Sequence, residues 1–304
     1  MPKILLPFSF LYSFLSQVDR KLTKKHELPK PVISVGNITW GGSGKTPIVI
    51  DLANLLLQQG LRVAVLTRGF GRKSKEAFLI SDPNKFLTQE VGDEPLLIAK
   101  SAPGAMVVVG ANRYANALRF SKESQADVYI LDDGFQHWAI KRNMDIVCIN
   151  AANPFGNGYI IPAGILRQSL KSLRKAQIIV ITNTNLVAPE RLNILKAKIA
   201  NFANCPILES YYGGYEIKTI DLLENVDKDF FKGKKIFALS GIGFNKGFNE
   251  TLKNAGFAVS DYFCLKDHQS YNQKLLREFF EKSAGGIIIT TAKDAVKISE
   301  ILED

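Results

Sequence analysis

A phosphate-binding loop stands out in the first part of the chain. The eight residues from Thr39 read Thr-Trp-Gly-Gly-Ser-Gly-Lys-Thr, and they lie between a predicted strand and a predicted helix. Glycines in this setting let backbone N–H groups turn toward phosphate oxygens, and the helix N-terminus adds partial positive charge. Lys45 would then reach the β- and γ-phosphates of a nucleotide and Thr46 would ligate Mg²⁺. The residues predicted to contact the nucleotide are Gly41, Gly42, Ser43, Gly44, Lys45 and Thr46. Thr39 stands where such loops usually have their first glycine, and Gly41 and Gly42 can supply that freedom.

A second polar motif follows an apolar run at residues 128–131. Two adjacent carboxylates, Asp132 and Asp133, close the run, and Gln136 and His137 come shortly after. Ligands of open α/β sheets bind at the carboxyl ends of strands, where a carboxylate can hold the Mg²⁺ of a bound nucleotide. A solvated strand end followed by an Asp-Gly turn is the alternative interpretation.

The remaining pattern alternates short apolar runs with helical stretches. The runs are nearly continuous in Val, Ile and Leu, as expected for parallel strands that are covered on both faces. This repeated β-α-β order predicts an α/β fold of the P-loop NTPase type, with helices on both faces of a parallel sheet. Strands are predicted at 32–37, 62–67, 106–110, 128–131, 145–150 and 178–182, and helices at 45–59, 112–122 and 189–202.

A second, smaller α/β lobe is predicted after a connector at 206–220. Within that connector, residues 211–215 read Tyr-Tyr-Gly-Gly-Tyr and suggest a strand, a turn and a strand. The sequence therefore predicts a P-loop domain at 31–205 and a smaller domain at 221–304. Strands of the smaller domain are predicted at 235–240, 257–264 and 286–290, and helices at 246–254 and 272–282.

The N-terminal segment, residues 1–30, is apolar and rich in aromatic residues before it turns basic. The apolar run is shorter than the roughly 20 residues of a simple membrane span, and it lacks the layout of a signal peptide. A helix that lies at a bilayer interface, with its flanking cations on anionic headgroups, explains this pattern. A helix packed on the domain is the alternative.

The charge of the chain is concentrated in two zones. The net charge is +10, and residues 1–31 hold six basic and two acidic residues while 160–200 hold seven and one. Such local zones argue against a protein that coats nucleic acid and favour an anionic membrane surface or a phosphorylated substrate. The three cysteines have no metal-binding or disulfide spacing, which indicates a reduced, intracellular setting.

Ordered motifs along nearly the whole chain resemble the tetraacyldisaccharide 4'-kinases, also called lipid A 4'-kinases. They begin with Val35–Thr39 leading into the phosphate loop. The later blocks are Arg68-Gly69-Phe70-Gly71, Val91-Gly92-Asp93-Glu94-Pro95, Val109-Gly110-Ala111-Asn112-Arg113, Leu131-Asp132-Asp133-Gly134-Phe135-Gln136-His137, Pro162-Ala163-Gly164-Ile165-Leu166-Arg167, Ser240-Gly241-Ile242-Gly243, Asp267-His268 and Thr291-Ala292-Lys293-Asp294-Ala295. Gln168, Gln269 and Ala292 depart from the family pattern, which usually has Glu, His and Glu there.

The resemblance implies an ATP-dependent transfer of phosphate to the 4'-hydroxyl of a lipid A disaccharide 1-phosphate precursor. It places the enzyme at the cytoplasmic face of the bacterial inner membrane and implies two lobes with the site in their cleft. Asp93 matches the family's catalytic base and His268 its partner. Asp132 and Asp133 match the metal-associated pair.

Transfer to an alcohol needs in-line placement, neutralised charge and a proton acceptor. In this scheme Lys45 and Mg²⁺ neutralise the γ-phosphate, and Asp93 accepts the hydroxyl proton with help from His268. The residues expected to contact the substrate are Arg68, Arg113, Gln136, His137 and Arg167, because arginine suits bidentate anion contacts.

Two other functions fit parts of the sequence. A P-loop GTPase or metallochaperone would need a base-reading Asn/Thr-Lys-x-Asp element, and residues 291–294 resemble one but lack the Asn. A nucleic-acid ATPase would explain the basic charge and would bind DNA or RNA with a steep salt dependence. No nucleic-acid motif accompanies that charge, so nucleic acid is not expected as a partner.

Overall fold

A computed structural model describes residues 2–243, 245–266 and 269–302 of the chain. The fold divides into two compact units. The larger contains residues 1–68, 76–81 and 102–211, and the smaller contains residues 69–75, 82–101 and 212–304. A segment from the first third of the sequence thus belongs to the same unit as the C-terminal residues.

The larger unit is built on an eight-stranded sheet with the order β3-β4-β2-β5-β1-β6-β7-β8. All neighbouring strands are parallel except β3, which is antiparallel to β4. The strands are β1 (Val32–Asn37), β2 (Val63–Thr67), β3 (Phe78–Ile80), β4 (Met106–Val109), β5 (Val128–Asp132), β6 (Met144–Asn150), β7 (Ile178–Thr182) and β8 (Ile207–Glu209). The central strand β1 lies between β5 and β6, so the loop after β1 is flanked by the ends of both.

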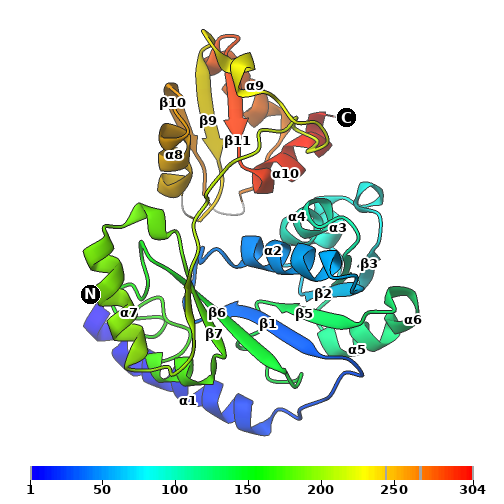
Figure 1. Cartoon of the computed structure of the whole chain (residues 1–304), viewed down its shortest axis with the longest axis vertical. Helices are drawn as coiled ribbons and strands as arrows, with labels where there is room; N and C mark the ends of the chain where they lie inside the picture. The colour runs from blue at the N-terminus through cyan, green and yellow to red at the C-terminus, as the bar shows by residue number, and fades with distance from the viewer. Residues whose placement is uncertain (1, 244, 267–268, 303–304) are drawn as a thin grey trace. The chain divides into compact units, whose positions relative to one another are not determined.

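Helices cover both faces of this sheet (Figure 1). The helix α2 packs against β1, β2 and β5 on one face, where Val49 and Ala53 are fully buried. The opposite face carries two apolar clusters, which include Ala117 and Ile199 from the helices that pack on this face. The helices of this unit are α1 (Leu6–Leu22), α2 (Lys45–Gln58), α5 (Arg113–Arg119), α6 (Ser121–Ser124) and α7 (Pro189–Ala200), with short 3₁₀ helices η1 (Pro2–Leu5), η3 (Leu170–Lys175) and η4 (Thr184–Leu186).

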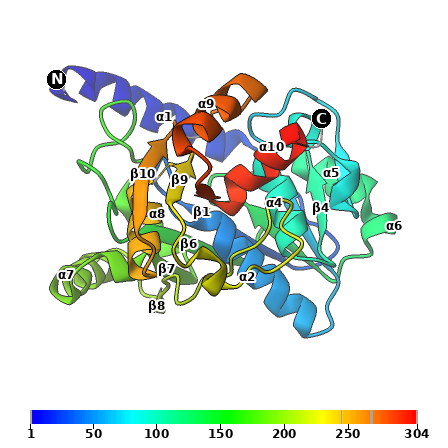
Figure 2. The same ribbon diagram turned by 90° about the horizontal axis from the view of Figure 1, so that it is seen from above.

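The smaller unit contains a three-stranded parallel sheet with the order β10-β9-β11. Figure 2 shows β9 beside β10, with α8 next to them. The elements are β9 (Ile236–Ser240), β10 (Val259–Cys264), β11 (Ile287–Thr290), α3 (Thr88–Val91), α4 (Asp93–Ser101), α8 (Asn245–Asn254), α9 (Gln273–Ser283), α10 (Ala292–Leu302), and the 3₁₀ helices η2 (Pro83–Lys85) and η5 (Lys228–Phe231). The sheet has its own apolar clusters, which include Ala238 on one side and Leu239 on the other.

The early segment is attached to this unit through the last helix, because α4 packs on α10. The backbone N and Oγ1 of Thr88 donate to the Glu300 carboxylate, the latter at 2.7 Å, and Lys293 Nζ lies 3.4 Å from Glu94 Oε1. Opposite charges on two facing helices therefore join residues about 200 positions apart in the sequence.

The predicted α/β fold with a parallel P-loop sheet and a second α/β unit is confirmed. The predicted strand–turn–strand at 211–215 is wrong, because β8 ends at Glu209 and no strand follows until β9. The glycine pair and its exposed tyrosines leave that stretch without an apolar face that could pair with a sheet. The proposed domain limits at 205 and 221 stay a prediction.

The helix α1 runs along the outside of the larger unit (Figure 1). Its buried residue is Ser9, whose Oγ donates to the Ile160 carbonyl at 2.7 Å and accepts from the Ala163 N–H at 3.1 Å. The apolar residues Ile4, Phe8, Phe10, Leu11, Phe14 and Leu15 are exposed. Among the described residues, none of the helices has both the length and the apolar character that a membrane span requires.

Candidate active site

The phosphate loop connects β1 to α2, as its sequence predicts. Gly44 has φ +73°, a left-handed conformation that glycine adopts without strain, and it caps the first turn of α2 at Lys45. A Cβ at Gly44 would also lie 3.2 Å from the Thr182 side chain. Glycine is therefore required here both by the backbone turn and by the close approach of β7.

Five parallel strands end in a buried polar side chain at the edge that carries this loop. Alternation along each strand places all five side chains on the α2 face of the sheet. The residues are Asn37, Thr67, Asp132, Asn150 and Thr182.

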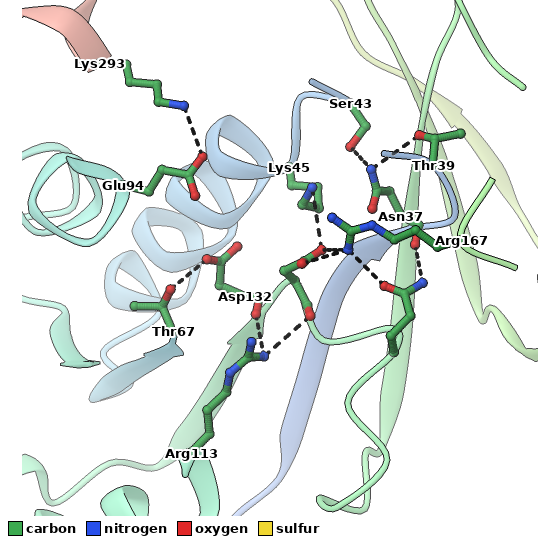
Figure 3. Close-up of polar contacts among 12 residues, drawn as sticks. Asn37, Thr39, Ser43, Lys45, Thr67, Glu94, Arg113, Asp132, Arg167 and Lys293 are labelled. Carbon is green, nitrogen blue, oxygen red and sulfur yellow. Dashed lines mark hydrogen bonds and ion pairs between the residues drawn. The ribbon is translucent and has the colours of Figure 1, made fainter. Parts of the chain in front are cut away.

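Three of these side chains hold the phosphate loop. Asn37 Nδ2 donates to Ser43 Oγ at 2.8 Å, Asn150 Nδ2 donates to the Gly42 carbonyl at 3.1 Å, and Thr182 Oγ1 donates to the Ser43 carbonyl at 2.9 Å. Because these strand ends bond the Gly42 and Ser43 carbonyls and the Ser43 hydroxyl, the protein itself fixes the position of the loop. Figure 3 shows Asn37 and Ser43 joined in this way.

Asp133 lies between two cations at the end of β5. Its carboxylate is 3.5 Å from Lys45 Nζ, and Arg167 Nη1 donates to both of its oxygens at 3.0 and 2.8 Å. Burial alone would raise the pKa of Asp133, but Lys45, Arg167 and Arg113 together lower it below the ordinary value. Asp133 also has φ +47°, which is costly for a non-glycine residue and fixes where its carboxylate points.

Backbone pairing brings Arg167 to this cluster. The Arg167 N–H donates to the Ile38 carbonyl at 2.8 Å, and the Trp40 N–H donates to the Ile165 carbonyl at 2.6 Å. The Pro-Ala-Gly block is thus joined to the entrance of the phosphate loop. Arg167 Nη1 also donates to Gln136 Oε1 at 3.1 Å, and Gln136 Nε2 donates to the Asn37 carbonyl at 2.7 Å. Asp133, Arg167, Gln136 and Asn37 therefore form one network, in which Figure 3 labels Arg167 and Asn37.

Asp132 and Arg113 form the other side of the site. Thr67 Oγ1 donates to Asp132 Oδ2 at 2.9 Å, while Arg113 Nη1 donates to the Asp132 carbonyl at 2.8 Å (Figure 3). Burial lowers the pKa of Arg113, and the two aspartates oppose that effect. Arg113 therefore holds the Asp132–Asp133 backbone in place through a hydrogen bond. Arg68, by contrast, is exposed at the end of β2.

His137 is half-buried beside the network. Burial lowers its pKa to about 4, with further contributions from Arg113 and Arg142. Within the described part of the chain, its Nε2 has no hydrogen-bond partner, while its backbone carbonyl accepts from Arg142. The imidazole is consequently neutral at pH 7 and is available as a hydrogen-bonding group rather than as a cation.

Asp93 belongs to the smaller unit, where it begins α4 and is only 7% exposed. Its Oδ2 lies 3.6 Å from Lys297 Nζ, and the same ammonium is 3.4 Å from Asp294 Oδ1. Asp294 Oδ2 accepts from the Gly241 N–H at 2.9 Å and from Thr291 Oγ1 at 2.8 Å. A buried lysine between two carboxylates thus fixes the residue that matches the family's base. His268 lies outside the described residues.

A family model for tetraacyldisaccharide-1-phosphate 4'-kinases, LpxK, matches residues 1–304. The chain belongs to this kinase family. The tetraacyldisaccharide 4'-kinase of Desulfotalea psychrophila is 34% identical over 310 residues, which cover 96% of this chain and 86% of that protein. That of Aquifex aeolicus is 36% identical over 302 residues, covering 97% of this chain and 89% of that protein.

A solved structure agrees with the sequence relatives. The crystal structure of LpxK from Aquifex aeolicus, an "apo" form in complex with ATP, has a TM-score of 0.77 to this chain at 34% identity. The match covers 98% of this chain and 90% of that one. The prediction of a tetraacyldisaccharide 4'-kinase, an enzyme of lipid A biosynthesis, is confirmed, and the GTPase or metallochaperone alternative is not supported.

The structure brings together most of the residues that the sequence singled out in the larger unit. Lys45, Asp132, Asp133, Arg113, Gln136 and Arg167 lie in one polar cluster at the carboxyl edge of the sheet. The sequence analysis missed Asn150, Thr182 and Lys297. A polar residue closing each apolar run was a usable signal for the first two. The spacing Asp294-x-x-Lys297 was a usable signal for the third.

Proposed function

We propose that the chain transfers the γ-phosphoryl group of ATP to the 4'-hydroxyl of a tetraacyldisaccharide 1-phosphate, with the triphosphate on the loop of residues 41–46. One observation carries this proposal. Lys45 begins α2 directly after the left-handed Gly44, and its ammonium is paired with Asp133 at the edge where open α/β sheets bind ligands. Lys45 would exchange this carboxylate for β- and γ-phosphate oxygens when nucleotide binds.

Asp93 is the proposed base and His268 its proposed partner. A buried carboxylate beside a buried ammonium stays ionised, and an ionised carboxylate is what accepts the hydroxyl proton. Asp93 also stands in the first turn of α4, where the partial positive charge of the helix N-terminus favours the charged form.

Mg²⁺ fits the donor chemistry of Asp132, Asp133 and Thr46. Magnesium usually takes one or two carboxylates and fills its other positions with phosphate oxygens and water. Within residues 2–243, 245–266 and 269–302 there is no group of three or more His, Cys, Asp or Glu side chains that could hold a metal. The ion would therefore depend on the nucleotide for much of its shell, and when bound it would neutralise charge on the phosphates.

The arginines are proposed to handle the acceptor and the moving phosphate. Arg167 is close to Lys45 through their shared partner Asp133, and its planar fork suits a phosphoryl group. Gln136 orients Arg167, and the neutral His137 and the exposed Arg68 are proposed to contact the sugar lipid. Arg113 is buried, so it would act through the Asp132–Asp133 backbone.

We further propose that the enzyme rests on the anionic cytoplasmic face of the bacterial inner membrane. The exposed apolar side of α1 supports this position, because Ser9 holds the helix on the protein while its aromatic residues face outward. Nucleic acid is not proposed as a partner. The proposed division of the chain is a membrane-interacting helix with a basic linker at 1–30, a P-loop kinase domain at 31–205, a connector at 206–220 and a smaller α/β domain at 221–304.

Radiolabelled ATP, purified tetraacyldisaccharide 1-phosphate and Mg²⁺ test the proposal through formation of a bis-phosphorylated lipid. Lys45→Ala and Asp93→Ala should each lower turnover by at least about 100-fold, the usual loss when one general base or charge-stabilising group is removed. Asp82→Ala, which removes the side-chain cap of the short helix η2, leaves every proposed catalytic group in place and serves as the matched control. Near-normal turnover in folded Asp93→Ala would refute the assignment of the base.

A further inference from the structure

Three cations surround one indole at the edge of the larger unit. The guanidinium carbons of Arg20 and Arg142 lie 5.2 and 5.9 Å from the Trp138 ring centroid, and Lys175 Nζ lies 5.4 Å from it. The ring is only 9% exposed. The two basic zones of the sequence therefore meet here, since Arg20 comes from α1 and Lys175 from η3.

The described residues balance the positive charge of this cluster only in part. Asp145 forms an ion pair with Arg142, whose Nε lies 2.8 Å from Asp145 Oδ1. In the part of the chain that the structure describes, Arg20 and Lys175 form no ion pair, and neither does the neighbouring Arg174. Burial, followed by Arg20, Arg174 and Arg142, lowers the pKa of Lys175 to about 8, against an opposing effect of Asp145. Like charges crowded in this way favour the uptake of an anion.

The cluster is separate from the phosphate loop. The helix η3 precedes β7 at Ile178, whereas Ser43 of the loop contacts the opposite end of β7 at Thr182. A strand of this length spans about 16 Å. An anion held at Trp138 is consequently not the phosphate that is transferred.

The cluster adjoins the helix whose apolar side is exposed. Arg20 follows Ser9 by eleven residues, or about three helical turns, so both lie on the side of α1 that faces the protein. An interfacial helix buries its apolar side about 5–10 Å into the boundary of a bilayer, and a helix is about 10 Å across. Arg20 would then stand at the depth of the lipid phosphates.

We propose that Arg20 and Lys175, which lie over the Trp138 ring, and Arg174, whose charge acts on Lys175, form a binding site for the phosphate of an anionic phospholipid headgroup. This inference rests on the proposed membrane association and adds a defined site to it. Arginine binds phosphate oxygens in a bidentate manner, and the lysine adds a third donor. Trp138 brings the charged groups of Arg20 and Lys175 together through cation–π contacts.

Vesicle sedimentation of the full chain tests this site with two matched charge variants. The double variant Arg20→Gln/Lys175→Gln removes two cluster cations, and Lys274→Gln/Arg277→Gln removes two exposed cations of α9. On vesicles that contain phosphatidylglycerol, the first should bind about 30-fold more weakly than wild type, since each cation near an anionic surface contributes about fivefold. The second should change by less than about threefold. Equal losses for the two variants would overturn the site and leave only general attraction.

Inorganic phosphate distinguishes the source of the ligand. In a Trp40→Phe background, Trp138 is the sole tryptophan of the chain, and its emission should change with phosphatidylglycerol vesicles. If 10 mM phosphate alone reproduces that change, the headgroup assignment is wrong and the site takes a free anion. No change with phosphate supports the headgroup assignment.

Kinase turnover on detergent-dispersed substrate should stay within about twofold in Arg20→Gln/Lys175→Gln. A wild-type chain that ignores anionic vesicles would instead refute the proposed membrane association.

Discussion

The ammonium of Lys297 lies 3.6 Å from Oδ2 of Asp93 and 3.4 Å from Oδ1 of Asp294, in the interior of the smaller unit. Its third neighbour is the ring of Tyr271, at 5.3 Å. Asp294 is completely buried and is already fixed by Gly241 and Thr291. Lys297 therefore links the proposed base, Asp93, to Asp294, a carboxylate whose position is fixed.

Lys297→Met should lower kcat by about tenfold to 100-fold, with little change in KM for ATP. Without the ammonium, the Asp93 carboxylate loses its preference for the charged form, so the acid limb of the pH–kcat profile should move to higher pH. Lys297→Arg should restore most of kcat and return the limb toward its wild-type position. Steady-state kinetics from pH 5 to pH 9 measures both effects.

Lys293→Met is the matched control for Lys297, because it removes the neighbouring α10–α4 ion pair with Glu94. Both variants lose a partly buried pair and should melt at lower temperatures. If Lys297 has a purely structural role, the acid limb of the pH–kcat profile should lie at the same pH in Lys297→Met and in Lys293→Met. That outcome would contradict the positioning role.

Thr182→Val should raise KM for ATP by about tenfold. The change keeps the shape of the side chain but leaves the Ser43 carbonyl without its hydrogen bond, and an unpaired buried polar group costs about 1–3 kcal/mol. The phosphate loop would no longer be fixed before nucleotide arrives. Thr184→Val provides the control, since Thr184 is equally buried but donates to Ser210, away from the loop. An equal rise in KM for both variants would argue against a specific effect on the loop.

His137 should make the protein less stable as the pH falls. Its pKa is about 4 in the folded chain, below the ordinary value of 6.5, so between these values the unfolded chain binds the proton and the folded chain does not. The resulting destabilisation starts near pH 6.5, grows toward pH 4 and is then constant. Partial exposure of the ring reduces it to on the order of 2 kcal/mol.

The measurement for His137 is the drop in melting temperature between pH 7.5 and pH 5. His137→Gln removes the titrating group, so the variant should show a smaller drop than wild type. His26→Gln, in the segment between α1 and β1 and stacked on Tyr114, serves as the control. Identical drops in wild type and His137→Gln would mean that His137 is protonated in the folded chain.

The short edge strands β3 and β8 were missed, because three residues are too few to show a pattern. Sequence periodicity was sufficient for the other strands of both sheets and for α2. Their apolar runs are long, and the phosphate loop marks the junction of β1 with α2. The helix α4 was missed because Gly92-Asp93-Glu94-Pro95 has the composition of a loop. Pro95 is tolerated there since the first turn of a helix leaves its N–H groups unpaired.

The site was predictable as a set of residues, but its internal contacts were not. Thr182 and Ser43 are 139 residues apart, and only the register of β1, β6 and β7 brings them together. The same holds for Lys297, whose partner Asp93 belongs to a segment that joins the C-terminal unit through ion pairs between helices. Strand order and helix docking are long-range outcomes that local patterns do not encode.

Ser9→Ala should loosen α1 from the larger unit. The Ser9 hydroxyl makes two hydrogen bonds with the 160–163 segment. Their loss leaves the Ala163 N–H without this acceptor and the Ile160 carbonyl with the Gly164 N–H as its remaining donor. At about 1 kcal/mol for each bond, the melting temperature should fall by a few degrees, and proteolysis in the linker at residues 23–30 should become faster. Ser16→Ala, on the same helix, is the matched control. If both variants melt and are cleaved as wild type, packing of the rest of α1 rather than Ser9 holds the helix in place.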